Sequence, residues 1–193
     1  AWYAADRGTI GRGQPAPVPE WLDYSLWQGP APGRPYRDNV VHYNWHWRWH
    51  WGGGEMANNG IHALDVARWG LGADCPRRVT CGGGRYCFDD DQETPDTVLA
   101  TFDFGDRMAT WEGHSCHPRG LEGTGFGLTF EGDGGSLLLL DAGWKQFDPK
   151  KKLVAEGAGS WDDRRHFENF IAAIRGDAKL NSEIAEGQKS TRL

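Results

Sequence analysis

The sequence predicts an α+β domain in which a largely antiparallel open sheet carries helices on one face. Three observations support this class: a two-faced helical segment after Gly54, a run of short strand-like segments separated by Gly/Asp turns, and a second amphipathic helix at 161–175. The other face of the sheet then needs a cover. A second copy of the chain is the simplest candidate, so we expect a homo-oligomer formed through that face.

The first helix is expected after the triple glycine at 52–54. Glu55 in its first turn suits the helix dipole, Gly72 follows the last periodic residue, and Pro76 prevents continuation. One stripe of this helix is apolar and rich in small residues, which predicts close contact with a sheet. The opposite stripe is formed by Glu55, Asn58, His62, Asp65 and Trp69.

Strand signals dominate the second half of the chain, and their tight turns predict antiparallel pairing. Strands are expected at 79–88, 97–104, 108–116, 126–131 and 135–140, with a further short strand at 144–147. The helix at 161–175 is expected to face the protein interior with its apolar residues Phe167, Phe170, Ile171 and Ile174. A last helix is expected to begin near Ser182.

Residues 42–51 alternate between aromatic and polar side chains. In an extended strand, a tyrosine and four tryptophans would line one face, and an asparagine, an arginine and three histidines would line the other. An aromatic surface beside hydrogen-bonding groups is what a sugar-like ligand needs. The candidate ligand contacts are Asn44, His46, Trp47 and Arg48. The alternative is that the tryptophans are core or interface residues and that the polar face is simply hydrated.

Composition excludes several classes of partner. A formal charge of -6 argues against a surface for nucleic acid or anionic membrane. No apolar stretch approaches the roughly 20 residues of a membrane helix. Histidines spaced by four on a strand lie too far apart to share one ion, and the four cysteines form no Cys-x-x-Cys pair, so no metal site is predicted. Free, mostly buried thiols are expected, and the sequence does not exclude a disulfide.

With 193 residues, 38% of them hydrophobic, the chain fits a single domain spanning 1–193. Residues 11–40 are rich in proline, glycine and tryptophan, which predicts an ordered arm with at most one short helix. Its expected anchors are Trp21, Leu22, Leu26 and Trp27. Both ends of the sequence look cut, so we expect a piece of a longer protein. The compartment is left open: a cytoplasmic location is favoured, and a periplasmic one is allowed by the missing natural N-terminus.

Several short motifs occur together. These are Trp27-Gln28-Gly29-Pro30, Asn44-Trp45-His46-Trp47, Gly54-Glu55, Gly60-Ile61-His62-Ala63-Leu64-Asp65 and Glu93-Thr94-Pro95-Asp96. In this combination the chain resembles the C-terminal domain of the glucose-fructose oxidoreductase / inositol dehydrogenase family (Gfo/Idh/MocA), in particular its bacterial branch with a Trp-rich C-terminal domain.

The resemblance implies a two-domain parent enzyme whose N-terminal Rossmann domain binds NAD or NADP. That domain is absent from this sequence, where no Gly-x-Gly-x-x-Gly follows a strand. We therefore expect this chain to be the substrate-binding and oligomerisation half, inactive alone. The implied substrate is a sugar, a cyclitol or a similar polyol. Two alternatives stay open: nicotinamide-dependent glycoside cleavage, and a non-catalytic carbohydrate-binding module.

The resemblance also assigns roles on the first helix. His62 matches the histidine that accepts a proton from the substrate hydroxyl, a role for which a neutral imidazole is suited near neutral pH. Asn58 stands where many members place an aspartate; an amide can position a hydroxyl but cannot carry its proton. Asp65, one turn after His62, is the carboxylate placed to stabilise an imidazolium or to contact substrate, and a structural role is the alternative.

Overall fold

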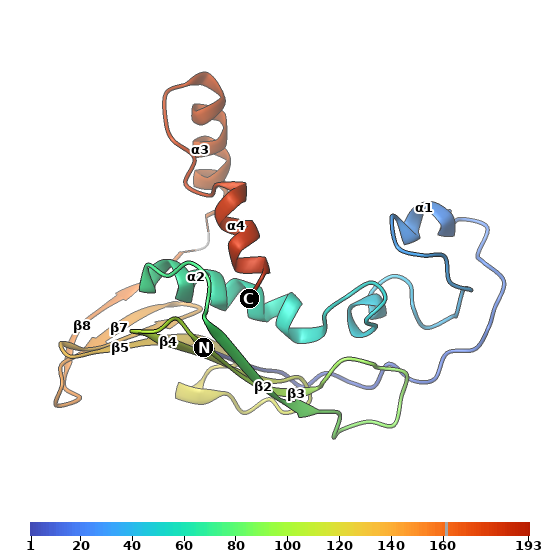
Figure 1. Ribbon diagram of the computed structural model, residues 1–193, viewed down its shortest axis with the longest axis horizontal. Helices are drawn as coiled ribbons and strands as arrows, with labels where there is room; N and C mark the ends of the chain where they lie inside the picture. Colours follow the sequence, from blue (N-terminus) through green and yellow to red (C-terminus); the bar gives the residue numbers. More distant parts are fainter. Residues whose placement is uncertain (161) are drawn as a thin grey trace.

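The computed structural model describes residues 1–160 and 162–193 of the chain (Figure 1). Its sheet has eight strands, in the order β2-β3-β4-β1-β5-β6-β7-β8. The strands are β1 (Trp2–Ala4), β2 (Arg78–Gly84), β3 (Thr97–Asp103), β4 (Met108–His114), β5 (Phe126–Gly132), β6 (Gly135–Leu140), β7 (Gly143–Phe147) and β8 (Leu153–Ala158). The six strands expected from the sequence are confirmed, although β2 and β4 end earlier than expected; β1 and β8 were not expected.

Strand β1 joins the two halves of the sheet. It pairs in parallel with β4, where Trp2 is opposite Glu112, and in antiparallel orientation with β5, where Trp2 is opposite Gly127. All other pairings are antiparallel between strands consecutive in sequence, such as β3 with β4. The N-terminal segment is thus built into the middle of the sheet, a position that strand signals in the sequence did not reveal.

The long helices lie on one side of the sheet, which confirms the α+β class (Figure 1). The helical elements are α1 (Tyr24–Gln28), the 3-10 helix η1 (Asn44–Trp47), the π-helix η2 (Met56–Gly60), α2 (Ile61–Leu71), the 3-10 helix η3 (Leu121–Gly123), α3 (Asp163–Arg175) and α4 (Ile184–Thr191). Among the described residues, no helix is both long and apolar enough to cross a membrane.

The core forms where α2 packs on β3 and β4. Six buried residues make up this cluster: Ala63, Leu64, Val98, Ala100, Phe102 and Trp111. Gly60 allows the close approach, because a Cβ there would lie 3.3 Å from the Trp111 ring. Helix α2 ends as predicted at Gly72, whose left-handed backbone (φ 60°) lets its amide cap the last turn.

Helix α3 corrects one prediction. Its apolar residues do not face inward: Phe167 is 64% exposed and Ile174 is 66% exposed. Figure 1 shows α3 standing away from the sheet, so its amphipathic pattern has no partner in the described chain. Trp161, the expected start of this helix, lies outside the described residues; α3 begins at Asp163, capped by Asp162.

The arm is ordered and carries the single short helix α1, as predicted, but its anchors differ from those expected. Trp21 and Leu26 are largely exposed, at 65% and 78%. Tyr24 is buried instead, stacked on Trp27 with ring centroids 5.5 Å apart. Amphipathic spacing in a five-residue helix is too short to determine which side chains are covered.

Candidate active site

A π-helical turn, η2, precedes α2 and changes which residues share a side of the helix. A π-turn closes i→i+5 hydrogen bonds and so holds one more residue than an α-turn. Asn59 borders the same hollow as His62, whereas Asn58 does not. The side-chain amides of Asn58 and Asn59 both donate to Glu55 Oε1, that of Asn58 at 3.4 Å. The sequence grouped Asn58 with His62, but Asn58 is not among the residues that border this hollow.

His62 is exposed on the flank of α2 and borders an open hollow of about 660 Å³. Its polar border is formed by Tyr3, Asn59, His62, Asp65 and Asp141. Its apolar floor comes from β5 and β6 and includes Phe126, Leu128, Leu139 and Leu140. A mostly apolar concavity with a few polar groups is typical of small-molecule sites. The hollow lies against the sheet rather than beside the tryptophan segment, where it was expected.

The phenol of Tyr3 belongs to a buried charge network. Arg7 donates from Nη2 to the Tyr3 oxygen at 3.2 Å and from Nε to Glu55 Oε2 at 2.8 Å. Burial and the nearby Glu55 carboxylate raise the pKa of Tyr3, so the phenol keeps its proton at neutral pH. Burial alone would lower the pKa of Arg7, but Glu55 outweighs it and the pKa is raised.

Glu55 is the centre of this network. It was expected on the polar stripe of the helix, opposite the apolar one, and it is only 2% exposed. Besides Arg7, it accepts hydrogen bonds from Asn58, Asn59 and the Ser115 hydroxyl. A buried carboxylate is tolerated because it is paired and hydrogen-bonded. The network fixes the π-turn from which Asn59 points toward the hollow.

Asp65 borders the same hollow, but its side chain is hydrogen-bonded to a residue of α4. Its Oδ1 accepts a hydrogen bond from the Ser190 hydroxyl, and the buried Arg68 donates to the same hydroxyl at 2.9 Å. Arg68 is also ion-paired with Glu186 at 2.8 Å. Within the described chain, the hydrogen bond of Asp65 therefore goes to Ser190 rather than to His62. This carboxylate docks α4 on α2.

The aromatic segment at 42–51 is not a strand, which corrects a central prediction. It folds into turns around η1, so its side chains do not divide into two faces. Asn44 donates to the Asn39 carbonyl at 2.9 Å. His46 donates from Nδ1 to the Tyr43 carbonyl at 2.5 Å and stacks on Trp45, with ring centroids 3.9 Å apart. These bonds hold the segment in its turns.

Trp47 and Arg48 are buried, at 3% and 6% exposed. The Trp47 carbonyl accepts the amides of Glu93 and Thr94, while Arg7 lies 4.8 Å from its ring centroid. Arg48 is ion-paired with Asp91 at 3.1 Å. The backbone carbonyl of Trp47 and the side chain of Arg48 thus connect the aromatic segment to the loop at 89–96. None of the four candidates on this segment lines the hollow at His62.

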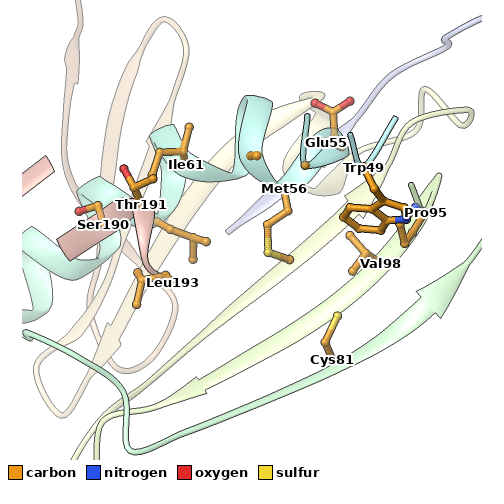
Figure 2. Close-up of a pocket in the computed structure, with 13 residues that line it drawn as sticks. Trp49, Glu55, Met56, Ile61, Cys81, Pro95, Val98, Ser190, Thr191 and Leu193 are labelled. Atoms are coloured by element: carbon orange, nitrogen blue, oxygen red, sulfur yellow. The ribbon is translucent and has the colours of Figure 1, made fainter. Parts of the chain in front are cut away.

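A second hollow, of about 330 Å³, lies between the π-turn, the sheet and the C-terminal residues (Figure 2). Figure 2 shows Met56 directed from η2 toward Val98 of β3, with Leu193 on another side. Cys81 projects toward it from β2, and Trp49 closes one end. Its lining is mainly apolar, so it suits a hydroxyl-rich ligand less well than the hollow at His62.

Residues 5–100 match the family model GFO_IDH_MocA_C2, which is described as the C-terminal alpha/beta domain of an oxidoreductase family. The chain belongs to the Gfo/Idh/MocA family. Residues 5–100 include Arg7, Glu55, Asn59 and His62 but end before β4. None of the curated proteins matches the sequence.

Solved structures share the fold. A protein described as an NADPH-dependent oxidoreductase from Desulfitobacterium hafniense matches with a TM-score of 0.59 and 16% identity, covering 77% of this chain and 46% of its own. An oxidoreductase from Bacillus subtilis matches with a TM-score of 0.56 and 19% identity, covering 75% of this chain and 48% of its own. Biliverdin reductase from Synechocystis sp. PCC 6803, in complex with biliverdin and NADP+, matches with a TM-score of 0.55 and 14% identity. The match covers 85% of this chain and 48% of the reductase. The chain spans less than half the length of these proteins.

Of the residues that border this hollow, the sequence pointed to His62 and Asp65 but not to the other polar ones. Tyr3, Asn59 and Asp141 reach the hollow from β1, the π-turn and the end of β6. Arg7 and Glu55 are 48 positions apart, and no short-range pattern joins them. An arginine shortly after an apolar N-terminal stretch and a glutamate after three glycines were the available signals.

Proposed function

We propose that this chain forms the substrate side of an NAD(P)-dependent oxidoreductase acting on a sugar, a cyclitol or a similar polyol, with His62 as the proton acceptor. One observation carries the proposal: His62 stands exposed at an open hollow of suitable size, with an apolar floor and several hydroxyl-binding groups on its border. Family membership and the shared fold of NADPH- and NADP+-associated oxidoreductases support the nicotinamide cofactor.

The border residues suit a hydroxylated ring. The protonated Tyr3 phenol can donate to a substrate oxygen. In the described structure the Asn59 amide donates to Glu55, which leaves the side-chain oxygen of Asn59 to accept from a hydroxyl. The leucines of the floor can contact the C–H face of the ring. This division of polar edge and apolar face is what sugar recognition requires.

The chemistry divides between the two domains of the proposed parent. NAD or NADP, held mainly by the N-terminal domain, supplies the hydride acceptor. A ring nitrogen of His62 takes the hydroxyl proton as the carbon is oxidised, because an imidazole can gain and return a proton near neutral pH. Tyr3 and Asn59 hold the hydroxyl group and its neighbours so that this nitrogen lies within hydrogen-bond distance.

The test uses the parent enzyme with a panel of aldoses and cyclitols, and measures nicotinamide reduction. His62→Ala should lower kcat at least about 100-fold, as expected for loss of a general base. His166→Ala is the matched control, because His166 is exposed on α3, away from the sheet, and should leave kcat unchanged. Release of an aglycone from a glycoside without net nicotinamide reduction would instead indicate glycoside cleavage. Ligand binding without turnover would indicate a binding module.

A further inference from the structure

Three side chains capable of holding a metal come together at the end of the sheet where β3 begins and β4 ends. The ligand atoms of Cys87, Asp96 and Cys116 all lie within 4.8 Å of one another. Cys87 is in the connection between β2 and β3, Asp96 immediately precedes β3, and Cys116 follows β4. Among the described residues, this is the one group of three or more potential metal ligands that the fold brings together.

The backbone fixes their arrangement. The register of β3 with β4 puts Thr97 opposite His114, and Ser115 donates its amide to the Asp96 carbonyl at 2.8 Å. Asp96 in turn donates its own amide to the Gly84 carbonyl at 3.1 Å, at the end of β2. The three ligand-bearing segments are therefore tied to one another by main-chain hydrogen bonds, as a preformed site requires.

The Asp96 carboxylate is oriented but not neutralised. It is 4% exposed, and its Oδ2 accepts the amides of Tyr86 at 2.7 Å and Cys87 at 3.1 Å. Its Oδ1 accepts the Thr97 hydroxyl at 2.9 Å. A carboxylate offers about four acceptor positions, so one position on Oδ1 is left. Within the described chain Asp96 forms no ion pair, which leaves a buried negative charge with neutral donors only.

We propose that Cys87, Asp96 and Cys116 bind a thiophilic divalent cation such as Zn²⁺, through the two Sγ atoms and Asp96 Oδ1. Each thiol loses its proton to solvent, so two protons are released for each cation bound. A Zn–S bond of about 2.3 Å places two tetrahedral sulfurs about 3.8 Å apart, so the existing separations need only small side-chain movements. The hydrogen bonds to Asp96 act as the outer contacts that orient a metal-bound carboxylate.

The surroundings favour a cation over a simple disulfide. Both thiols lie within 4.8 Å of the Asp96 carboxylate, which is buried and forms no ion pair within the described chain. A disulfide would not compensate Asp96. Both cysteines also line a hollow of about 430 Å³ that includes His114 and Glu112, which are hydrogen-bonded at 2.8 Å. Three protein ligands leave a fourth position facing this hollow, where water can bind.

The test measures metal content and affinity directly, without enzyme activity. The full-length protein is stripped with a chelator, kept reduced with a phosphine, and titrated with Zn²⁺ against a chromogenic chelator, with elemental analysis for stoichiometry. One equivalent is expected to bind tightly. Cys87→Ser and Cys116→Ser should each weaken binding at least about tenfold. Cys75→Ser and Cys81→Ser are the controls, since these thiols lie elsewhere, and should not change it.

Cobalt provides a second readout of the ligands. Co²⁺ bound to the wild-type protein should show a thiolate charge-transfer band that either Cys87→Ser or Cys116→Ser weakens. The proposal is overturned if Zn²⁺ does not bind stoichiometrically, or if binding is the same in wild type and in both serine variants. It is also overturned if the protein isolated without reductant carries a Cys87–Cys116 disulfide and, once reduced, binds no cation.

Discussion

Arg7 and Glu55 form a partly buried ion pair, with Arg7 Nε 2.8 Å from Glu55 Oε2, that joins the segment after β1 to the residue that precedes the π-turn. The Arg7 side chain is 21% exposed and that of Glu55 1%. The pair links two parts of the proposed site, since Arg7 also contacts the Tyr3 phenol and Glu55 accepts from Asn59. The geometry of the hollow at His62 therefore depends on this contact.

Glu55→Gln should lower the free energy of unfolding by about 2–4 kcal/mol, because it leaves the Arg7 charge without its counterion. Urea denaturation followed by tryptophan fluorescence measures the change. Glu131→Gln, on an exposed edge of β5, is the control and should cost less than about 0.5 kcal/mol. A Glu55→Gln variant as stable as this control would show that the ion pair does not hold the two segments together.

Tyr3→Phe should reduce kcat/KM of the parent enzyme about three- to tenfold, the effect of losing one hydrogen bond to substrate. Tyr43→Phe is a closely matched control, because the Tyr43 oxygen also accepts a hydrogen bond from Arg7, at 2.6 Å, but Tyr43 does not border the hollow. Both variants lose a contact to Arg7, whereas Tyr3→Phe alone removes a group from the site. Equal kcat/KM values for the two variants would argue against a role for Tyr3 in substrate binding.

Acid should release the arm through Asp91. Burial alone would raise the pKa of Asp91, but hydrogen bonds to its carboxylate, first that of the Gly13 amide, lower it below the ordinary value. Because the folded-state pKa is depressed, this stabilisation is present above the unfolded pKa. It is lost as pH falls below about 4.

Limited proteolysis of the arm across this pH range, at constant temperature with an acid-active protease, measures the release. Asp91→Asn should make the arm sensitive already at neutral pH and remove the acid-dependent step. Asp133→Asn, in an exposed turn, should behave as wild type. An acid-dependent step that persists in Asp91→Asn would assign it to another carboxylate.

Sequence periodicity predicted the elements that are regular and locally determined. The hairpin strands and the end of α2 at Gly72 follow from alternation, turn residues and a glycine cap, all of which act over a few positions. The alternation at 42–51 led to the wrong prediction of a strand. The same alternation is compatible with turns, and here a loop distant in the sequence binds the carbonyl of Trp47. The strand β1 was missed because only three residues pair.

The candidate site was predicted in part for a similar reason. His62 follows from its motif, but its neighbours depend on long-range contacts: Tyr3 reaches the hollow only because β1 inserts between β4 and β5. The carboxylate of Glu55, which binds the Asn59 amide, is itself held by Arg7 and Ser115 from distant parts of the chain. Neither effect can be read from residue spacing, since both arise from tertiary packing.

The most direct test of the account is the turnover of His62→Ala in the parent enzyme, measured with and without added imidazole. The account places the His62 side chain at an open hollow, so a free imidazole can enter the space that the substitution vacates. We expect kcat to fall at least about 100-fold and to rise again with imidazole concentration, while KM changes little. A His62→Ala enzyme that turns over like wild type, with or without imidazole, would contradict the proposed role of this residue.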